Sequence, residues 1–188
     1  MDNYKYSQTW FLRSEIKNNL EKYLDKSKEN KMLEIGCFEG LSSVFFADNF
    51  LDNQHSTLTC VDPFLSINNN DHSELLQNNE EMRFDYNISV CRHADKITIH
   101  KVTSDQFFEN NNKTYNFIYI DGCHDPDFIK RDIENSFKFL EKNGIMWMDD
   151  YGGGDGIQIK NAMNIILEQY KGQYELIHSG YQLAIQKK

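Results

Sequence analysis

Residues 115–154 read YNFIYIDGCHDPDFIKRDIENSFKFLEKNGIMWMDDYGGG, and this stretch decides the fold. It contains two short apolar runs, Phe117–Ile120 and Ile145–Met148. Between them, apolar residues recur at helical spacing from 128 to 140, and Gly144 follows as a stop signal. The pattern predicts a strand, a helix and a second strand, which is the repeating unit of an α/β sheet.

Acidic residues end both of these strands. Asp121 follows the first run, with His124 three residues later, and Asp149 and Asp150 follow the second. Parallel strands of one sheet point their carboxyl ends the same way, so we expect three carboxylates and an imidazole to meet at one edge. Two adjacent acids repel each other, which favours a metal ion between them over a simple loop cap.

Upstream, a glycine-rich turn follows the predicted strand at 32–35. The residues LEIGCFEG (33–40) place Glu34 in the strand, then Gly36, Phe38 and Gly40 in the turn before a helical run. Gly36 permits a tight turn, and a helix N-terminus offers free N–H groups to an anion. The spacing E-x-G-x-x-x-G differs from the dinucleotide pattern G-x-G-x-x-G, which argues against an NAD-linked oxidoreductase.

Two further polar residues follow later predicted strands. Asp62 ends the strand at 56–61, and with Glu34, Gly36 and Gly40 upstream a contact with the hydroxyls of a ribose is favoured over a cap for the turn before Pro63. Ser104 follows the strand at 96–102 and is either a contact for a purine ring or the start of a helix. Glu34, Gly36, Asp62, Ser104 and the acids all fall at carboxyl ends of strands, a coincidence that indicates a ligand site.

The remaining segments complete an α/β chain of about seven strands. Residues 1–30 are predicted to be helical, with aromatic side chains that pack on the sheet or line a substrate wall. Residues 66–80 form a polar loop or lid, residues 81–91 and 158–170 are helices, and residues 152–156 form a glycine-rich loop. Residues 174–185 predict an antiparallel closing hairpin.

Composition limits the class of protein. The chain has 188 residues, which suits one domain, and a net charge of −9, which disfavours nucleic acid as a partner. No apolar run is long enough to span a membrane, and the first residues lack a secretory signal, so a cytoplasmic location is expected. The four cysteines are dispersed, which favours buried thiols over zinc ligands.

With these motifs identified, residues 32–188 resemble a class I S-adenosylmethionine (SAM)-dependent methyltransferase. The segments LEIGCFEG, CVDPF, FIYIDGCH and GIMWMDDYG have the order of that family's motifs. The resemblance implies a Rossmann-like α/β fold: a seven-stranded, mostly parallel sheet with an antiparallel C-terminal strand and helices on both faces. Residues 1–30 would be an N-terminal helical segment and residues 31–188 the methyltransferase domain, within a single domain overall.

More narrowly, IDGCH followed by MDDYG resembles the metal-dependent sugar O-methyltransferases (methyltransferase family 24, the macrocin and mycinamicin type). In that branch Asp121, Asp149 and Asp150 would hold Mg²⁺ or another divalent cation. His124 would be the general base, with Asp121 beside it in the catalytic group. The cofactor SAM would lie along a set of residues at the strand ends: Glu34, Gly36, Phe38, Gly40, Asp62, Ser104 and Asp121.

The resemblance implies transfer of a methyl group to a hydroxyl of a small molecule, with a sugar or glycoconjugate as the expected acceptor. A catechol or phenol, an RNA ribose, and a non-catalytic binding protein with the same fold remain alternatives. The sugar enzymes are generally larger and oligomeric, so a homo-oligomer is a further state to test.

Overall fold

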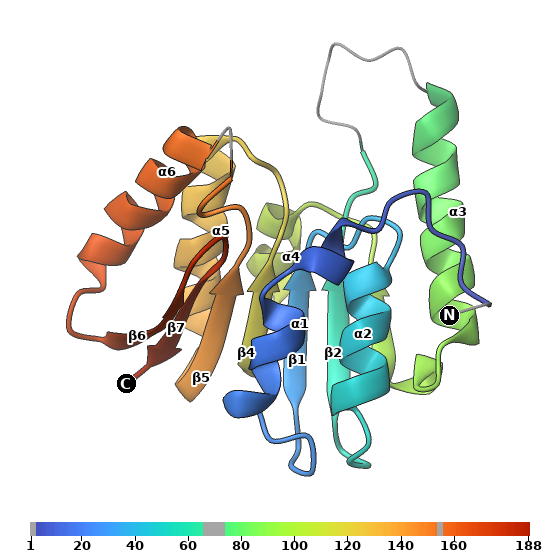
Figure 1. The fold of residues 1–188 in the computed structure, drawn as a ribbon, viewed down its shortest axis with the longest axis horizontal. Helices are drawn as coiled ribbons and strands as arrows, with labels where there is room; N and C mark the ends of the chain where they lie inside the picture. The colour runs from blue at the N-terminus through green and yellow to red at the C-terminus, as the bar shows by residue number, and fades with distance from the viewer. Residues whose placement is uncertain (1–2, 66–73, 154–155) are drawn as a thin grey trace.

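Seven strands form one sheet in the order β3-β2-β1-β4-β5-β7-β6 (Figure 1). The computed structural model describes residues 3–65, 74–153 and 156–188, without the side chains of 74–79 and 156. The strands are β1 (Lys31–Ile35), β2 (Thr57–Val61), β3 (Ile97–His100), β4 (Tyr115–Ile120), β5 (Leu140–Met148), β6 (Tyr174–Ser179) and β7 (Leu183–Lys187). Neighbours from β3 to β5 run parallel, whereas β7 is antiparallel to both β5 and β6. The mostly parallel sheet with an antiparallel closing hairpin is therefore confirmed.

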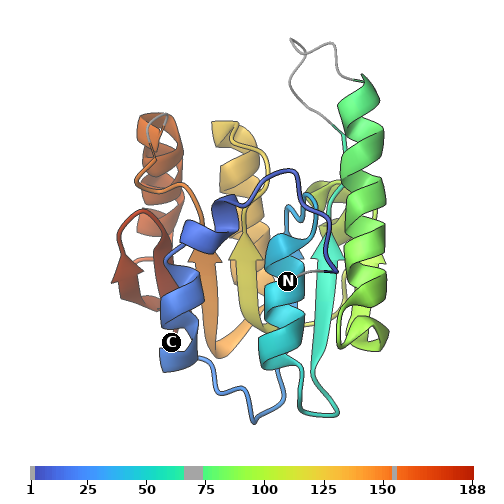
Figure 2. The same ribbon diagram turned by 45° about the vertical axis from the view of Figure 1, so that its right-hand side comes forward.

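Helices cover both faces of this sheet, as predicted (Figures 1 and 2). The helical elements are η1 (Trp10–Arg13), α1 (Ile16–Asn19), η2 (Leu20–Lys22), α2 (Leu41–Phe50), α3 (Glu74–Val90), η3 (Ala94–Lys96), α4 (Ser104–Asn110), α5 (Pro126–Phe139) and α6 (Gly156–Gln169). Side chains alternate along each strand, so Met32 packs with the layer of α1, α2 and α3, and Leu33 packs with α4, α5 and α6. Both faces are buried, which explains why the central strands are almost wholly apolar.

The register of the parallel strands places the predicted site residues in one row. Beyond the last paired residues, backbone hydrogen bonds continue for one more step. Gly36 N–H donates to Val61 O (2.9 Å), Asp121 N–H to Ile35 O (2.8 Å), and Asp149 N–H to Ile120 O (2.9 Å). Asp121 and Asp149 are therefore aligned with the turn after β1, at the carboxyl edge of the sheet. This row is the edge that the sequence predicted.

Gly36 allows the two central strand ends to lie against each other. It has a φ of +84°, and a Cβ at this position would lie 2.0 Å from the backbone oxygen of Asp121. Any larger residue would push the turn after β1 away from the turn after β4. The glycine is required here by the close approach of two backbones.

The N-terminal segment differs from the prediction of a helix over residues 1–30. Within the described part of that range, only η1, α1 and η2 are helical, and the chain before them crosses the carboxyl ends of the central strands (Figures 1 and 2). Contacts with the rest of the molecule hold it there. Ser7 donates its N–H and hydroxyl to Glu39, and Gln182 accepts the Ile16 N–H at 2.7 Å. These tertiary bonds outweigh the helical spacing of the apolar residues.

Another predicted helix boundary also differs from the structure. The helix predicted at 81–91 begins earlier, so α3 includes residues 74–80 of the predicted polar loop. Residues 66–73 of that loop lie outside the described residues, as do residues 154 and 155 of the glycine-rich loop. Among the helices that the structure describes, none has the length and apolarity needed to cross a membrane.

Candidate active site

Three carboxyl groups converge at the ends of β4 and β5. Asp121 follows β4, and Asp149 and Asp150 follow β5. Asp150 has a φ of +60°, a left-handed conformation that Asp tolerates better than most residues. Because this conformation turns the chain directly after a straight strand, successive acids can both reach the same cavity.

Asp121 and Asp149 are partly buried, and both lie within reach of the same hydroxyl donor. The Tyr119 hydroxyl donates to Asp149 Oδ2 at 2.6 Å and lies 3.3 Å from Asp121 Oδ2. Burial raises the pKa of Asp121 well above its ordinary value, and the negative charges of Asp149 and Asp150 raise it further. Burial also raises the pKa of Asp149. The ionised forms of these acids are therefore disfavoured unless a positive charge lies between them.

Asp150 is the best solvated acid of the three and has two side-chain partners. His124 Nε2 lies 2.8 Å from Asp150 Oδ2, and the Tyr181 hydroxyl donates to Asp150 Oδ1 at 2.5 Å. The hydrogen bond from His124 lowers the pKa of Asp150, although burial opposes it. His124 itself is mostly exposed, so this contact fixes its ring against the site while leaving one side open to the cavity.

A cavity of about 690 Å³ opens above these residues, and we call it the acid cavity. All three acids line it, together with His124 and Tyr181. Its opposite wall comes from the N-terminal segment and the turn after β1. There Trp10 stacks on Phe38 with the ring centroids 5.7 Å apart.

A second cavity of about 410 Å³, the side cavity, adjoins the first. The two cavities share four lining residues: Gly36, Phe38, Asp121 and His124. Of the two cavities, Asp62 and Ser104, the predicted ribose and purine contacts, line only the side cavity. A long ligand could therefore extend from the tip of β3 to the acids without leaving the protein surface.

Asp62 also orders the glycine-rich turn. Its Oδ2 accepts the N–H groups of Cys37 and Phe38 at 2.7 and 2.9 Å, and its Oδ1 accepts the Phe64 N–H at 2.7 Å. The turn-capping role considered from the sequence is therefore present. A carboxylate has about four acceptor positions, so a ribose hydroxyl could still bind.

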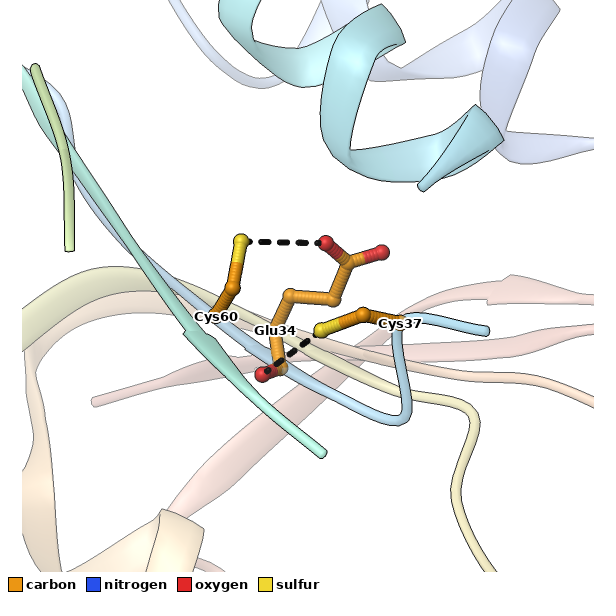
Figure 3. A group of neighbouring side chains, drawn as sticks. All are labelled: Glu34, Cys37 and Cys60. Carbon is orange, nitrogen blue, oxygen red and sulfur yellow. Dashed lines mark hydrogen bonds between the residues drawn. The ribbon is translucent and has the colours of Figure 1, made fainter. Parts of the chain in front are cut away.

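Glu34 occupies a different place from the one predicted. It is fully buried beneath α2, where the hydroxyls of Ser42 and Ser43 donate to its two carboxylate oxygens. The Cys60 thiol donates to Oε2 at 3.7 Å (Figure 3). Neither cavity includes Glu34 in its lining, so its position gives no direct contact with a ligand there. Instead, it ties the start of α2 to β1.

The thiols around Glu34 are held in their neutral form. The ligand atoms of Glu34, Cys37 and Cys60 lie within 4.8 Å of one another (Figure 3), but burial raises the pKa of both thiols. Metal ions bind thiolates, and a carboxylate with three donors has little need of a cation. This group is a hydrogen-bonded framework. All four cysteines are free, and three of them are buried as expected.

Most of the predicted site residues come together, with two differences besides Glu34. Gly40 precedes α2 and packs against Phe84, and it lines neither cavity. Among the described residues around the acids, the ligand atoms within 4.8 Å of one another belong to Asp121, His124 and Asp150. Asp149, predicted as a metal ligand, instead accepts hydrogen bonds from Tyr119 and from the Asp150 N–H.

Two tyrosines that contact the acids, Tyr119 and Tyr181, were not predicted from the sequence. Tyr119 is one of several alternating apolar residues in β4, and nothing in that pattern marks its hydroxyl as a partner of Asp149. Tyr181 lies in the β6–β7 hairpin, about thirty residues after Asp150 in the chain, and only the antiparallel return of β7 beside β5 brings them together. No local signal could have identified either residue.

The acid cluster fits a hard divalent cation. Its donors are carboxylate oxygens with one imidazole beside them, and burial together with the negative charges of Asp149 and Asp150 raises the pKa of Asp121. A cation bound there would reverse this effect and favour the ionised carboxylates. This donor chemistry fits Mg²⁺ better than it fits a thiolate-binding metal.

Comparison with known proteins agrees with this architecture. The family model described as "Methyltransferase domain" matches residues 33–151, so the chain belongs to this family. The sheet order and the antiparallel β7 are those of the class I methyltransferase fold, which confirms the expected family and fold. No curated protein matches the chain by sequence.

Several solved structures share the fold at low sequence identity. A putative rRNA-methylase from Clostridium thermocellum is 13% identical with a TM-score of 0.70, covering 98% of this chain and 100% of its own. The O-methyltransferase of Bacillus cereus in complex with SAH is 14% identical with a TM-score of 0.60 (99% and 85% covered). TomG of Streptomyces achromogenes, an O-methyltransferase in complex with SAM, is 13% identical with a TM-score of 0.61 (87% and 75% covered).

Proposed function

We propose that this chain is a SAM-dependent O-methyltransferase that requires Mg²⁺ or another divalent cation and methylates a hydroxyl of a small molecule, with a sugar or glycoconjugate as the acceptor. The observation that carries the proposal is the convergence of Asp121, Asp149, Asp150 and His124 on one cavity. Carboxylates that face each other without a balancing cation are expensive to bury unless they bind something positive.

The cofactor fits the two joined cavities. Asp62 would accept the ribose hydroxyls in the side cavity, and Ser104 would lie near the adenine. Gly36 and Phe38, at the junction of the cavities, would face the methionine end. The TomG and Bacillus cereus structures, which hold SAM and SAH, support this assignment by their common fold.

Asp121 and Asp150 would hold the cation, with Asp149 as a further ligand. When bound, such an ion lowers the pKa of a coordinated hydroxyl and thereby favours its ionisation. Tyr119 and Tyr181 hold Asp149 and Asp150 in place by hydrogen bonds of 2.6 and 2.5 Å. Their role is to keep the carboxylates in position before any ligand arrives.

His124 would remove the proton of the acceptor hydroxyl as it attacks the methyl group. Its contact with Asp150 holds the imidazole at the cavity wall and stabilises the protonated ring that forms. The neutral imidazole is an effective acceptor near physiological pH.

The wall facing the acids suits the ring of an acceptor. Trp10 and Phe38 present stacked aromatic surfaces, and sugar rings as well as phenols pack well on such surfaces. Two vicinal hydroxyls could bind a cation together, and a sugar or a catechol offers such a pair whereas a simple phenol does not. The net charge of −9 disfavours RNA.

The test is methyl transfer from radiolabelled SAM to matched panels of sugars, glycosides, catechols and phenols, with Mg²⁺ or with EDTA. We expect transfer to a sugar hydroxyl that stops with EDTA and returns with Mg²⁺. Transfer to catechols alone would overturn the sugar assignment, and equal rates with EDTA would overturn the metal requirement. Absence of SAM and SAH binding by calorimetry would overturn the whole proposal.

A further inference from the structure

Asp132 is a buried acid that the proposed chemistry does not use. It lies in α5, its side chain is 3% exposed, and it forms part of the lining of the side cavity. The nearby Ser104 hydroxyl lowers the pKa of its carboxyl group, against the larger effect of burial, which raises it. Its Oδ2 lies 3.5 Å from where a Cβ on Gly122 would be, so the group fills the corner between α4, α5 and the turn after β4.

One oxygen of this carboxyl group lacks a partner. Within the described part of the chain, Asp132 Oδ1 is buried without any hydrogen bond, and Asp132 forms no salt bridge. The neighbouring Arg131 pairs instead with Asp105, at 3.1 Å. Burying a carboxylate oxygen without a donor is costly, and buried polar groups in native proteins almost always have a partner. The missing donor is therefore expected from a ligand.

The carboxyl group is an acceptor at working pH. Burial raises the pKa of Asp132 to about 6, which still leaves it mostly ionised at pH 7.5. An ionised carboxylate can only accept hydrogen bonds, so the matching ligand must present N–H or O–H groups. Rotation about the Cβ–Cγ bond is soft, so either oxygen can turn toward such a donor.

The surroundings define the shape of the ligand. Apolar side chains make up much of the side-cavity lining, including Ile35, Val61, Phe64 and Phe128. A flat heteroaromatic ring with an amino group on its edge would bury its faces against these residues and direct its N–H groups at Asp132. Adenine has this form, because its exocyclic amine carries two donors.

We propose that Asp132 binds the exocyclic amino group of the cofactor's adenine and makes the site selective for adenine over hypoxanthine. This inference rests on the proposed function, because adenine enters the side cavity as part of SAM. It adds a residue from α5 to a contact that the sequence assigned to Ser104 alone.

The experiment compares S-adenosylhomocysteine with S-inosylhomocysteine, in which an oxo group replaces the amine, by calorimetry at pH 7.5. The wild-type protein should bind the inosyl compound about 10- to 100-fold more weakly, because an oxo oxygen then faces a carboxylate. Asp132→Asn supplies an amide donor for the oxo group and should reduce this ratio at least about tenfold. Glu134→Gln, an exposed change of the same charge on α5, should leave the ratio unchanged.

Each outcome decides the proposal. Equal binding of both compounds by the wild-type protein would overturn the role of Asp132 while leaving SAM as the cofactor. An unchanged ratio in a folded Asp132→Asn protein would assign the residue a purely structural role. If Asp132→Asn does not fold, Asp132→Ser offers a smaller donor and acceptor for the same comparison. Failure of the wild-type protein to bind either compound would overturn the proposed function, and this inference with it.

Discussion

Glu34 in β1 and Asp121 just past the neighbouring strand β4 are both acids, yet their surroundings differ. Glu34 lies inside β1 and receives hydrogen bonds from Ser42, Ser43 and Cys60. Asp121 lies just past β4, where the nearest charged groups include two more acids. Donors satisfy the first acid, which makes it part of the framework. The second shares its surroundings with further acids that raise its pKa, which is typical of a ligand site.

Replacing Asp121 with Asn should have the largest effect on activity. We expect Mg²⁺-dependent turnover to fall by at least about 1000-fold, since a cation ligand and its charge are lost. The metal-free protein should become about 1 kcal/mol more stable, because one of several repelling acids is removed. Transfer assays and urea unfolding in EDTA measure both effects. Normal Mg²⁺ stimulation in this variant would remove Asp121 from the cation site.

Replacing His124 with Ala tests the proposed general base, which lies in the same site as Asp121. Turnover should fall about 100-fold while SAH affinity changes little, because His124 acts on the acceptor proton. Single-turnover rates across pH 5–9, compared with SAH binding, separate the two effects. A rate–pH profile identical to that of the wild type would exclude the base role.

Glu34 has a structural role, so Glu34→Ala should mainly reduce the free energy of unfolding. It leaves the buried hydroxyls of Ser42 and Ser43 without their acceptor and opens a cavity, so we expect a loss of about 3 kcal/mol at pH 5.5. Urea unfolding provides the measurement, with the exposed Glu134→Ala as the control, expected within about 0.5 kcal/mol of wild type. A wild-type unfolding midpoint for Glu34→Ala would contradict the framework role.

The pH dependence of stability should report Glu34 as well. Burial raises its pKa from 4.5 to about 7, so the folded state favours the neutral form. The stability contributed by Glu34 is then complete below pH 4.5 and is lost as pH rises through about 7. Between pH 5 and 8 the wild type should lose about 2 kcal/mol relative to Glu34→Gln, which does not titrate. If the free energies of unfolding of the two proteins changed equally with pH across this range, the raised pKa of Glu34 would be refuted.

The smallest effect is expected for Tyr181→Phe. It removes one hydrogen bond to Asp150 and leaves the carboxylate otherwise in place, so turnover should fall about fivefold to tenfold. Tyr174→Phe in the same hairpin is the matched control and should behave as wild type. Equal rates for the two variants would show that Asp150 needs no support from the hairpin.

The fold could be predicted from the sequence to a large extent because its signals are local. Apolar runs, glycine turns and amphipathic segments each act over a few residues, and parallel strands must end at a common edge. Thus the positions of Asp62, Asp121 and Asp149 at strand ends followed directly from the chain. The prediction of a helix over the N-terminal segment was wrong, because the bonds that hold this segment, to Glu39 and Gln182, join residues far apart in sequence.

The sequence by itself determined which residues stand at the ligand-binding edge, since strand length and alternation fix where each chain turn falls. Only the tertiary structure decided what each acid does there. Glu34 turned inward because β1 places alternate side chains against α2, whose serines satisfy it. Asp150 gained Tyr181 because β7 returns beside β5. The partners of a buried charge come from distant parts of the chain, and those partners separate a structural acid from a functional one.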